Sequence, residues 1–218
     1  MEPSWIFVTA FAVAASGALV PGPLLTYTVS ESITRGWSAG PLIVLGHALL
    51  EILLVISLFL GLQTLITSET VKGTIGLVGG GVLLWMGTNI LRQLYNNKLD
   101  LELEEGSLSI CFWKNPVVGG VVVSLSNPYF LLWWATIGFA YLIYSASYGF
   151  MGICLFVVGH LMADLVWYSA VSLVVVRGKN HLKAGIYRGI LAVCGLFLVA
   201  LALYFIWDGW QNLPLVSV

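Results

Sequence analysis

Long apolar stretches separated by short polar ones dominate the chain. Residues 3–30, 73–91 and 189–207 carry no charged side chain, and residues 115–176 hold a single one, Asp164. Because a helix needs about 20 apolar residues to cross the hydrocarbon core of a bilayer, the pattern predicts six transmembrane helices. They are expected near residues 5–30, 38–66, 73–94, 117–144, 148–176 and 186–208.

The composition supports an integral membrane protein. Of the 218 residues, 59% are hydrophobic and 9% are charged, and the mean hydropathy is +0.97. Such a chain cannot cover its apolar surface with a polar shell, which excludes a soluble globular domain. Nine basic against ten acidic residues leave no basic face, so nucleic acid is not expected as a partner. The expected partner is the lipid bilayer.

The basic residues predict the orientation of the helices. With the N-terminus outside, the inner side collects eight of the nine lysines and arginines, and the outer side keeps only Lys72. An excess of Lys and Arg marks cytoplasmic loops. We therefore expect a multi-pass protein of the cytoplasmic membrane with both termini outside. The eight inner residues are Arg35, Arg92, Lys98, Lys114, Arg177, Lys179, Lys183 and Arg188.

An internal repeat relates the second predicted helix to the fifth. Residues 46–51 read Gly-His-Ala-Leu-Leu-Glu, and residues 159–164 read Gly-His-Leu-Met-Ala-Asp. Three helices per copy would make the second copy enter the membrane from the opposite side. The sequence thus predicts a 3+3 inverted-topology repeat, with 1–97 and 117–218 as the two three-helix units and 98–116 as a polar inner linker.

Prolines interrupt the helix that precedes each copy of this motif, at Pro21-Gly22-Pro23 and at Ser126-Asn127-Pro128. Proline lacks an N–H group and its ring clashes with the carbonyl four residues earlier, which would free groups such as the Ser124 carbonyl. Lipid cannot satisfy these groups, so the two breaks in helices 1 and 4 are expected to line a cavity. A simple kink filled by neighbouring helices is the alternative.

The candidate chemistry lies on the repeated motif. Glu51 and Asp164 are the only acids well inside the predicted spans, and His47 and His160 each lie one helical turn before one of them. These pairs could couple proton movement to transport, bind a first-row divalent metal, or pair with an ammonium group of a substrate. Two His–acid hydrogen bonds that only lock the helices remain the structural alternative.

Three tryptophans inside the predicted spans are weaker candidates for a binding role: Trp133, Trp134 and Trp167. We expect them to pack in the core or against lipid. An aromatic wall for a cationic ligand is the alternative.

The Pro-Gly-Pro of residues 21–23, the Arg-Gly-Trp-Ser-Ala-Gly of residues 35–40, Gly46 and the later Ser126-Asn127-Pro128 resemble the signatures of the LysE/RhtB family of lysine exporters. The likeness extends over essentially all six predicted helices. It implies secondary export driven by an ion gradient without an ATP site. It also implies that Pro21, Gly22, Pro23, Asn127 and Pro128 are broken-helix elements around a central site.

Together these features predict a secondary active exporter of amino acids or similar small metabolites, and no enzyme. Glu51 and Asp164 would exchange protons or cations, with His47 and His160 tuning that charge. No cofactor is expected beyond a bound divalent metal or coupling cation. The alternatives are a divalent cation exporter with these four residues as ligands, and a non-transporting structural or partner subunit. The sequence is compatible with a homodimer.

Overall fold

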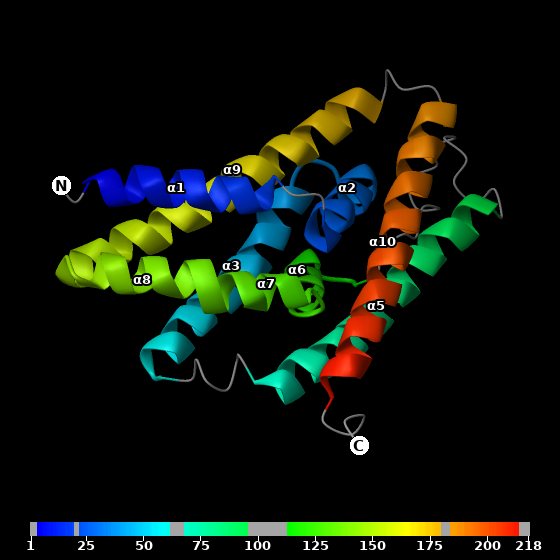
Figure 1. Ribbon diagram of the computed structural model, residues 1–218. Helices are drawn as coiled ribbons and strands as arrows, with labels where there is room; N and C mark the ends of the chain where they lie inside the picture. The colour runs from blue at the N-terminus through cyan, green and yellow to red at the C-terminus, as the bar shows by residue number, and fades with distance from the viewer. Residues whose placement is uncertain (1–3, 20–21, 62–67, 96–112, 180–183, 214–218) are drawn as a thin grey trace.

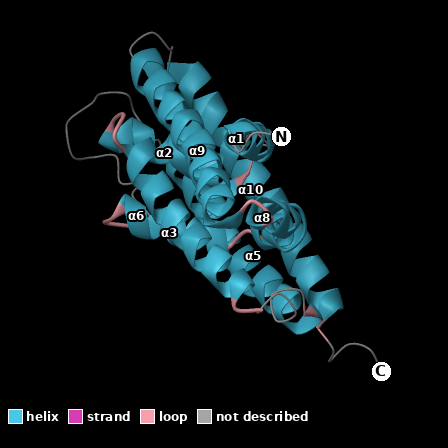
Figure 2. Ribbon diagram, turned by 90° about the vertical axis from the view of Figure 1, so that its left-hand side faces the viewer, coloured by secondary structure: helices cyan, strands magenta, loops and turns pink. Residues whose placement is uncertain are grey.

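The computed structural model describes residues 4–19, 22–61, 68–95, 113–179 and 184–213, and in these ranges the regular structure is entirely helical (Figure 2). Pro21 and most of the predicted linker, residues 98–112, lie outside the described residues. The helices are α1 (Ser4–Ala18), α2 (Pro23–Arg35), α3 (Ala39–Phe59), α5 (Glu69–Tyr95), α6 (Pro116–Leu125), α7 (Pro128–Trp133), the π-helical turn η1 (Trp134–Gly138), α8 (Phe139–Ala146), α9 (Gly149–Lys179) and α10 (Ala184–Asn212).

Five helical stretches of the described chain are long and apolar enough to cross a membrane, and a sixth is reached if α1 and α2 form one bent span. The protein is therefore an all-helical, multi-pass membrane protein. The second, third, fifth and sixth predicted spans each correspond to one of these stretches. The five are Ala39–Phe59, Glu69–Tyr95, Pro128–Ala146, Gly149–Gly178 and Leu191–Gln211.

The first and fourth predicted spans are not single helices. The axes of α1 and α2 differ by 79°, and the predicted span 117–144 divides into the short α6 and the continuous run 128–146. Both second segments begin with a proline at the first helical position, where a missing N–H costs nothing. The breaks are thus new helix starts rather than kinks.

Asparagine side chains cap the helix starts of the second half. The Oδ1 atoms of Asn115 and Asn127 accept hydrogen bonds from the backbone N–H groups of Val117 (2.9 Å) and Tyr129 (3.1 Å). The Ser124 carbonyl, expected to be freed by Pro128, accepts from the Asn127 N–H at 3.1 Å. That expectation was wrong, because the chain turns at the break and satisfies the carbonyl locally.

Figure 1 shows three helix pairings: α10 lies along α5, α1 along α9, and α6 against α3. Glycines permit the close approach. A Cβ on Gly46 of α3 would overlap the carbonyl oxygen of Val117 in α6, and a Cβ on Gly159 of α9 would lie 2.6 Å from the carbonyl oxygen of Phe7 in α1. The glycine of each repeated motif therefore marks the contact with the first segment of a broken helix.

The buried core consists of two apolar clusters, and α3 contributes to both. Ile43 and Val44 belong to one cluster, and Leu54 and Val55 belong to the other. The polar pair His47 and Glu51 lies between them along the helix. The fold thus places this buried polar pair between the two apolar clusters to which α3 contributes.

We predict that Gly46→Ala lowers the thermal stability of the detergent-purified protein. The added methyl group would force α3 and α6 apart, at a cost of about 1–3 kcal/mol. Gly81→Ala on α5 is the matched control, because nothing lies within 4 Å of the new methyl group. Tryptophan fluorescence during heating measures both variants, and equal melting temperatures would contradict the close α3–α6 contact.

Candidate functional site

Four polar side chains from α3 and α9 meet inside the helix bundle: His47, Glu51, His160 and Asp164, the acid–histidine cluster. Their exposed fractions are 7%, 2%, 5% and 5%. His160 Nε2 lies 2.8 Å from Glu51 Oε1, and His47 Nε2 lies 3.3 Å from the same oxygen. The structure thus brings together all four residues selected from the repeat.

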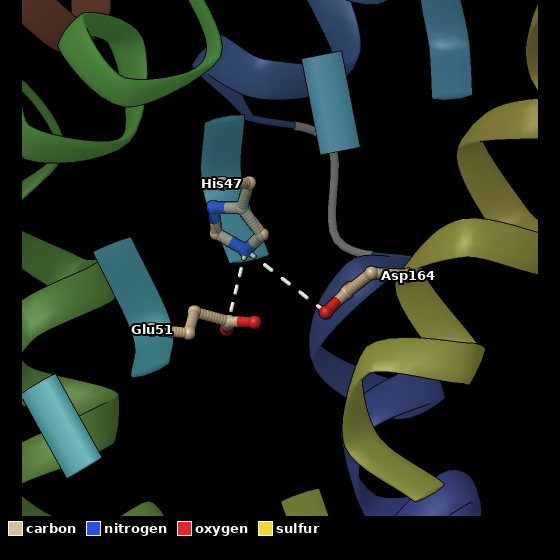
Figure 3. A group of neighbouring side chains, drawn as sticks. All are labelled: His47, Glu51 and Asp164. Atoms are coloured by element: carbon tan, nitrogen blue, oxygen red, sulfur yellow. Dashed lines mark ion pairs between the residues drawn. The ribbon is translucent and has the colours of Figure 1, made fainter. Parts of the chain in front are cut away.

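The pairing crosses between the helices. Asp164 Oδ2 lies 3.6 Å from His160 Nε2 on its own helix and 4.0 Å from His47 Nε2 on α3. His160 is therefore closer to Glu51 of the other helix than to Asp164 one turn away. Figure 3 shows His47 pointing between the two carboxylates, Glu51 and Asp164.

Ser124 of α6 orients His47. Its Oγ lies 2.7 Å from His47 Nδ1 and donates its own hydrogen to the Gly120 carbonyl at 2.7 Å. The hydroxyl oxygen therefore accepts from an Nδ1–H group, which leaves Nε2 facing the carboxylates. This role of the Ser124 side chain was not predicted from the sequence, although Ser124 is the one polar side chain of α6.

Trp134 of η1 binds Glu51. The indole Nε1–H donates to Glu51 Oε1 at 3.2 Å. The ring is 2% exposed, as expected of a core tryptophan, but it also contributes a hydrogen bond to the cluster. The sequence offered no signal for this bond, since residues 51 and 134 are brought together only by the packing of α3 against η1.

Aromatic rings flank both imidazoles. The His160 ring centroid lies 5.0 Å from that of Trp133 and 5.1 Å from that of Trp134, and the His47 centroid lies 5.0 Å from that of Phe130. Rings at this distance stabilise a positive charge on an imidazole. Trp133 and Trp134, expected to be packing residues, therefore form a wall of the site, whereas Trp167 packs against the apolar core as expected.

The cluster borders a cavity of about 330 Å³. Gly22, Pro23 and Asn127 of the two helix breaks also line it, as predicted. Ser126 and Pro128 are not among the lining residues; the Ser126 hydroxyl instead donates to the Val122 carbonyl at 2.7 Å. The remaining walls are mostly small or aromatic, and include Gly17, Tyr129, Phe130, Trp133 and Tyr168.

A third buried acid lies outside the cluster. Glu31 of α2 is fully buried and its Oε2 lies 2.6 Å from Arg35 Nε. Arg35 Nη2 also donates to the carbonyls of Trp113 (2.8 Å) and Lys114 (3.1 Å), which ties the end of α2 to the segment before α6. Glu31 was not predicted to be buried, because the predicted first span ended at residue 30, whereas α2 continues to Arg35.

Three residues of the cluster have the geometry to hold a metal ion. One ligand atom each from His47, Glu51 and Asp164 lie within 4.8 Å of one another. Imidazole nitrogen with carboxylate oxygens suits first-row divalent cations. His160 lies outside this group and instead contacts Glu51 Oε1.

Comparison with known proteins assigns the family. Residues 15–209 match the family model described as LysE type translocator. The chain belongs to the LysE family of translocators. This confirms the resemblance seen in the sequence motifs. LysE-type translocators are transporters, so the protein belongs to a transporter family.

Two relatives cover nearly the whole translocator. It is 23% identical to the "Putative amino acid efflux protein YcgF" of Bacillus subtilis, with 95% of this chain and 98% of the relative aligned. It is 24% identical to the "Chemotactic transduction protein ChpE" of Pseudomonas aeruginosa, with 90% of this chain and 95% of the relative aligned. No solved structure matches the chain significantly.

We predict that Ser124→Ala destabilises the translocator by about 1–3 kcal/mol, because it leaves the buried His47 Nδ1–H without its acceptor. Ser126→Ala is the matched control, since that hydroxyl bonds only to a carbonyl of its own helix. Thermal unfolding in detergent measures both. Equal stability of the two variants would show that the Ser124 hydroxyl does not hold His47.

Proposed function

We propose that the protein is a secondary active transporter that exports amino acids or similar small metabolites across the cytoplasmic membrane, coupled to a proton or cation gradient through Glu51 and Asp164. The observation that carries the proposal is the buried acid–histidine cluster on the wall of a cavity of about 330 Å³. Ionisable residues inside membrane spans are costly and typically mark substrate or ion pathways. The relative YcgF, named as an amino acid efflux protein, supports the choice of cargo.

The shape and lining of the cavity suit a small amphipathic cargo. The cluster supplies charge, and Phe130, Trp133 and Phe197 supply apolar surface. The segments at the two helix breaks supply irregular backbone, which within a membrane is tolerated where it borders a cavity. The site therefore offers both charged and apolar contacts to one small molecule.

Reciprocal helix contacts support a 3+3 inverted-topology repeat as the basis of alternating access. Gly46 of α3 meets Val117 of α6, and Gly159 of α9 meets Phe7 of α1. Each half thus packs its motif helix against the first segment of the other half's broken helix. With the basic residues on the inner side, both termini would face outward and the exporter would open its cavity to each side in turn.

We predict that the double variant Glu51→Gln, Asp164→Asn abolishes gradient-driven export while it still folds, because the amides keep the shape but carry no charge to exchange. Proteoliposomes loaded with radiolabelled amino acids and energised with a pH or cation gradient measure this. Glu69→Gln is the control, because the Glu69 side chain is 63% exposed at the start of α5. Normal export by the double variant would refute the coupling role.

Export of a divalent cation is the second candidate, favoured by the grouping of His47, Glu51 and Asp164 ligand atoms within 4.8 Å. Here the metal would be the cargo. We expect Mn²⁺-loaded vesicles to lose Mn²⁺ through the wild type and not through His47→Gln if this function holds. Amino acid export without Mn²⁺ movement decides for the first candidate. Movement of neither cargo would favour a non-transporting partner subunit.

A further inference from the structure

The two acids that the repeat makes equivalent have different surroundings in the structure. Glu51 Oε1 accepts from Trp134 Nε1 at 3.2 Å and contacts His160 Nε2 at 2.8 Å and His47 Nε2 at 3.3 Å. Three ring nitrogens thus converge on a single carboxylate oxygen, with the Trp134 N–H donating and each histidine Nε2 donating when it carries a proton. Charge-assisted hydrogen bonds of this kind are about twice as strong as neutral ones, so Glu51 is firmly held.

Asp164 has no comparable partners. It makes no hydrogen bond to any residue in the described part of the chain, and Oδ2 lies 3.6 Å and 4.0 Å from the nearest histidine nitrogens. The residue is 5% exposed and lines the cavity. A buried carboxylate without hydrogen bonds is strongly unfavourable, so it either takes up a proton or meets a cationic group from the cavity that it lines.

The histidines show the same asymmetry. His47 Nδ1 bonds to Ser124, seven residues after the Val117 contact, whereas His160 Nδ1 has no hydrogen-bond partner among the described residues. Seven residues after the matching Phe7 contact the chain has Ala14, which carries no polar group. The repeat therefore lacks one anchor on the α9 side of the cluster.

We propose that Asp164 is the cation-binding carboxylate of the cavity. Glu51 is a positioning residue that stays bound to Trp134 and His160 when the cation binds. The inference rests on the proposed function and narrows it, because it assigns the exchange of cations to one of the two acids. The ligand is a cationic group, either the ammonium of an amino acid or a metal cation. His47 Nε2, 4.0 Å from Asp164 Oδ2 and grouped with it in the candidate metal site, is a second group that such a ligand would meet when this nitrogen is unprotonated.

The first test compares the stability of single variants without ligand. We expect Glu51→Gln to lower the melting temperature by roughly 3–12 °C, because it removes the carboxylate charge that Trp134, His160 and His47 surround. Asp164→Asn should leave the melting temperature unchanged or raise it, since it removes an unsatisfied buried charge. Glu69→Gln serves as the exposed control. Equal losses in the Glu51 and Asp164 variants would overturn the assignment.

The second test measures binding by thermal stabilisation with L-lysine, L-leucine and MnCl₂ as separate probes, which distinguishes an ammonium from a metal cation. We expect at least one probe to stabilise the wild type and Glu69→Gln. Asp164→Asn should weaken its apparent affinity roughly 10-fold to 100-fold, and Glu51→Gln and Trp134→Phe should weaken it less. An apparent affinity in Asp164→Asn equal to that of the wild type would overturn the proposal. So would the absence of any rise in melting temperature with all three probes.

Ring nitrogen NMR of the three histidines separates positioning from general loss of structure. Glu51→Gln and Trp134→Phe should move the His160 signals strongly, whereas Asp164→Asn should move them less, because Asp164 lies farther from His160 Nε2 than Glu51 does. The stabilising probe should move the His47 signals only when Asp164 is present. His160 signals that respond to Asp164→Asn as strongly as to Glu51→Gln would argue against a positioning role.

These outcomes are separate from those of the transport assay. Wild-type proteoliposomes that export nothing would refute the proposed function and leave the stability contrast between Glu51 and Asp164 in place. Conversely, active export combined with equal behaviour of the two single variants would refute only the division of roles.

Discussion

The contact of His160 Nε2 with Glu51 Oε1, 2.8 Å between α9 and α3, is the interaction on which the rest of the site depends. Charged groups inside a membrane protein must face one another, because lipid offers them no partner. The elements around the cavity are attached to this pair by single polar contacts. Ser124 attaches α6 through His47, and Trp134 attaches η1 through Glu51.

Close contact between the backbones of α3 and α6 brings these polar groups within hydrogen-bond distance. A Cβ on Gly120 of α6 would overlap the Ile43 carbonyl of α3, just as one on Gly46 would overlap Val117. Without these glycines the two helices would lie farther apart, and the Ser124 hydroxyl would not reach His47. Small residues at helix interfaces are the usual means of close approach in membranes, where no hydrophobic force draws helices together. Packing and polar bonding therefore depend on each other at this interface.

The two halves of the chain differ in their polar contacts, although they share one kind of helix contact. Both motif glycines meet the first segment of a broken helix. Yet the second half supplies Ser124 and Trp134 to residues of α3, and Ala14 stands where the first half would have to supply a hydroxyl to His160. A transporter that changes shape around a fixed site needs some contacts that hold and others that exchange. In the proposed mechanism, the difference between Glu51 and Asp164 would meet this need within one cluster.

The sequence by itself determined the helical membrane class, the interruption of the first and fourth spans by proline, and the placement of His47 with Glu51 and of His160 with Asp164 on single helix faces. These follow from local rules, because apolar length, the missing proline N–H and the four-residue spacing each act within one segment. Only the tertiary structure decided that His160 pairs with Glu51, that Ser124 and Trp134 complete the cluster, and that Glu31 is buried. These contacts depend on where separate helices cross, and residues such as 51 and 134 are related by no spacing rule along the chain.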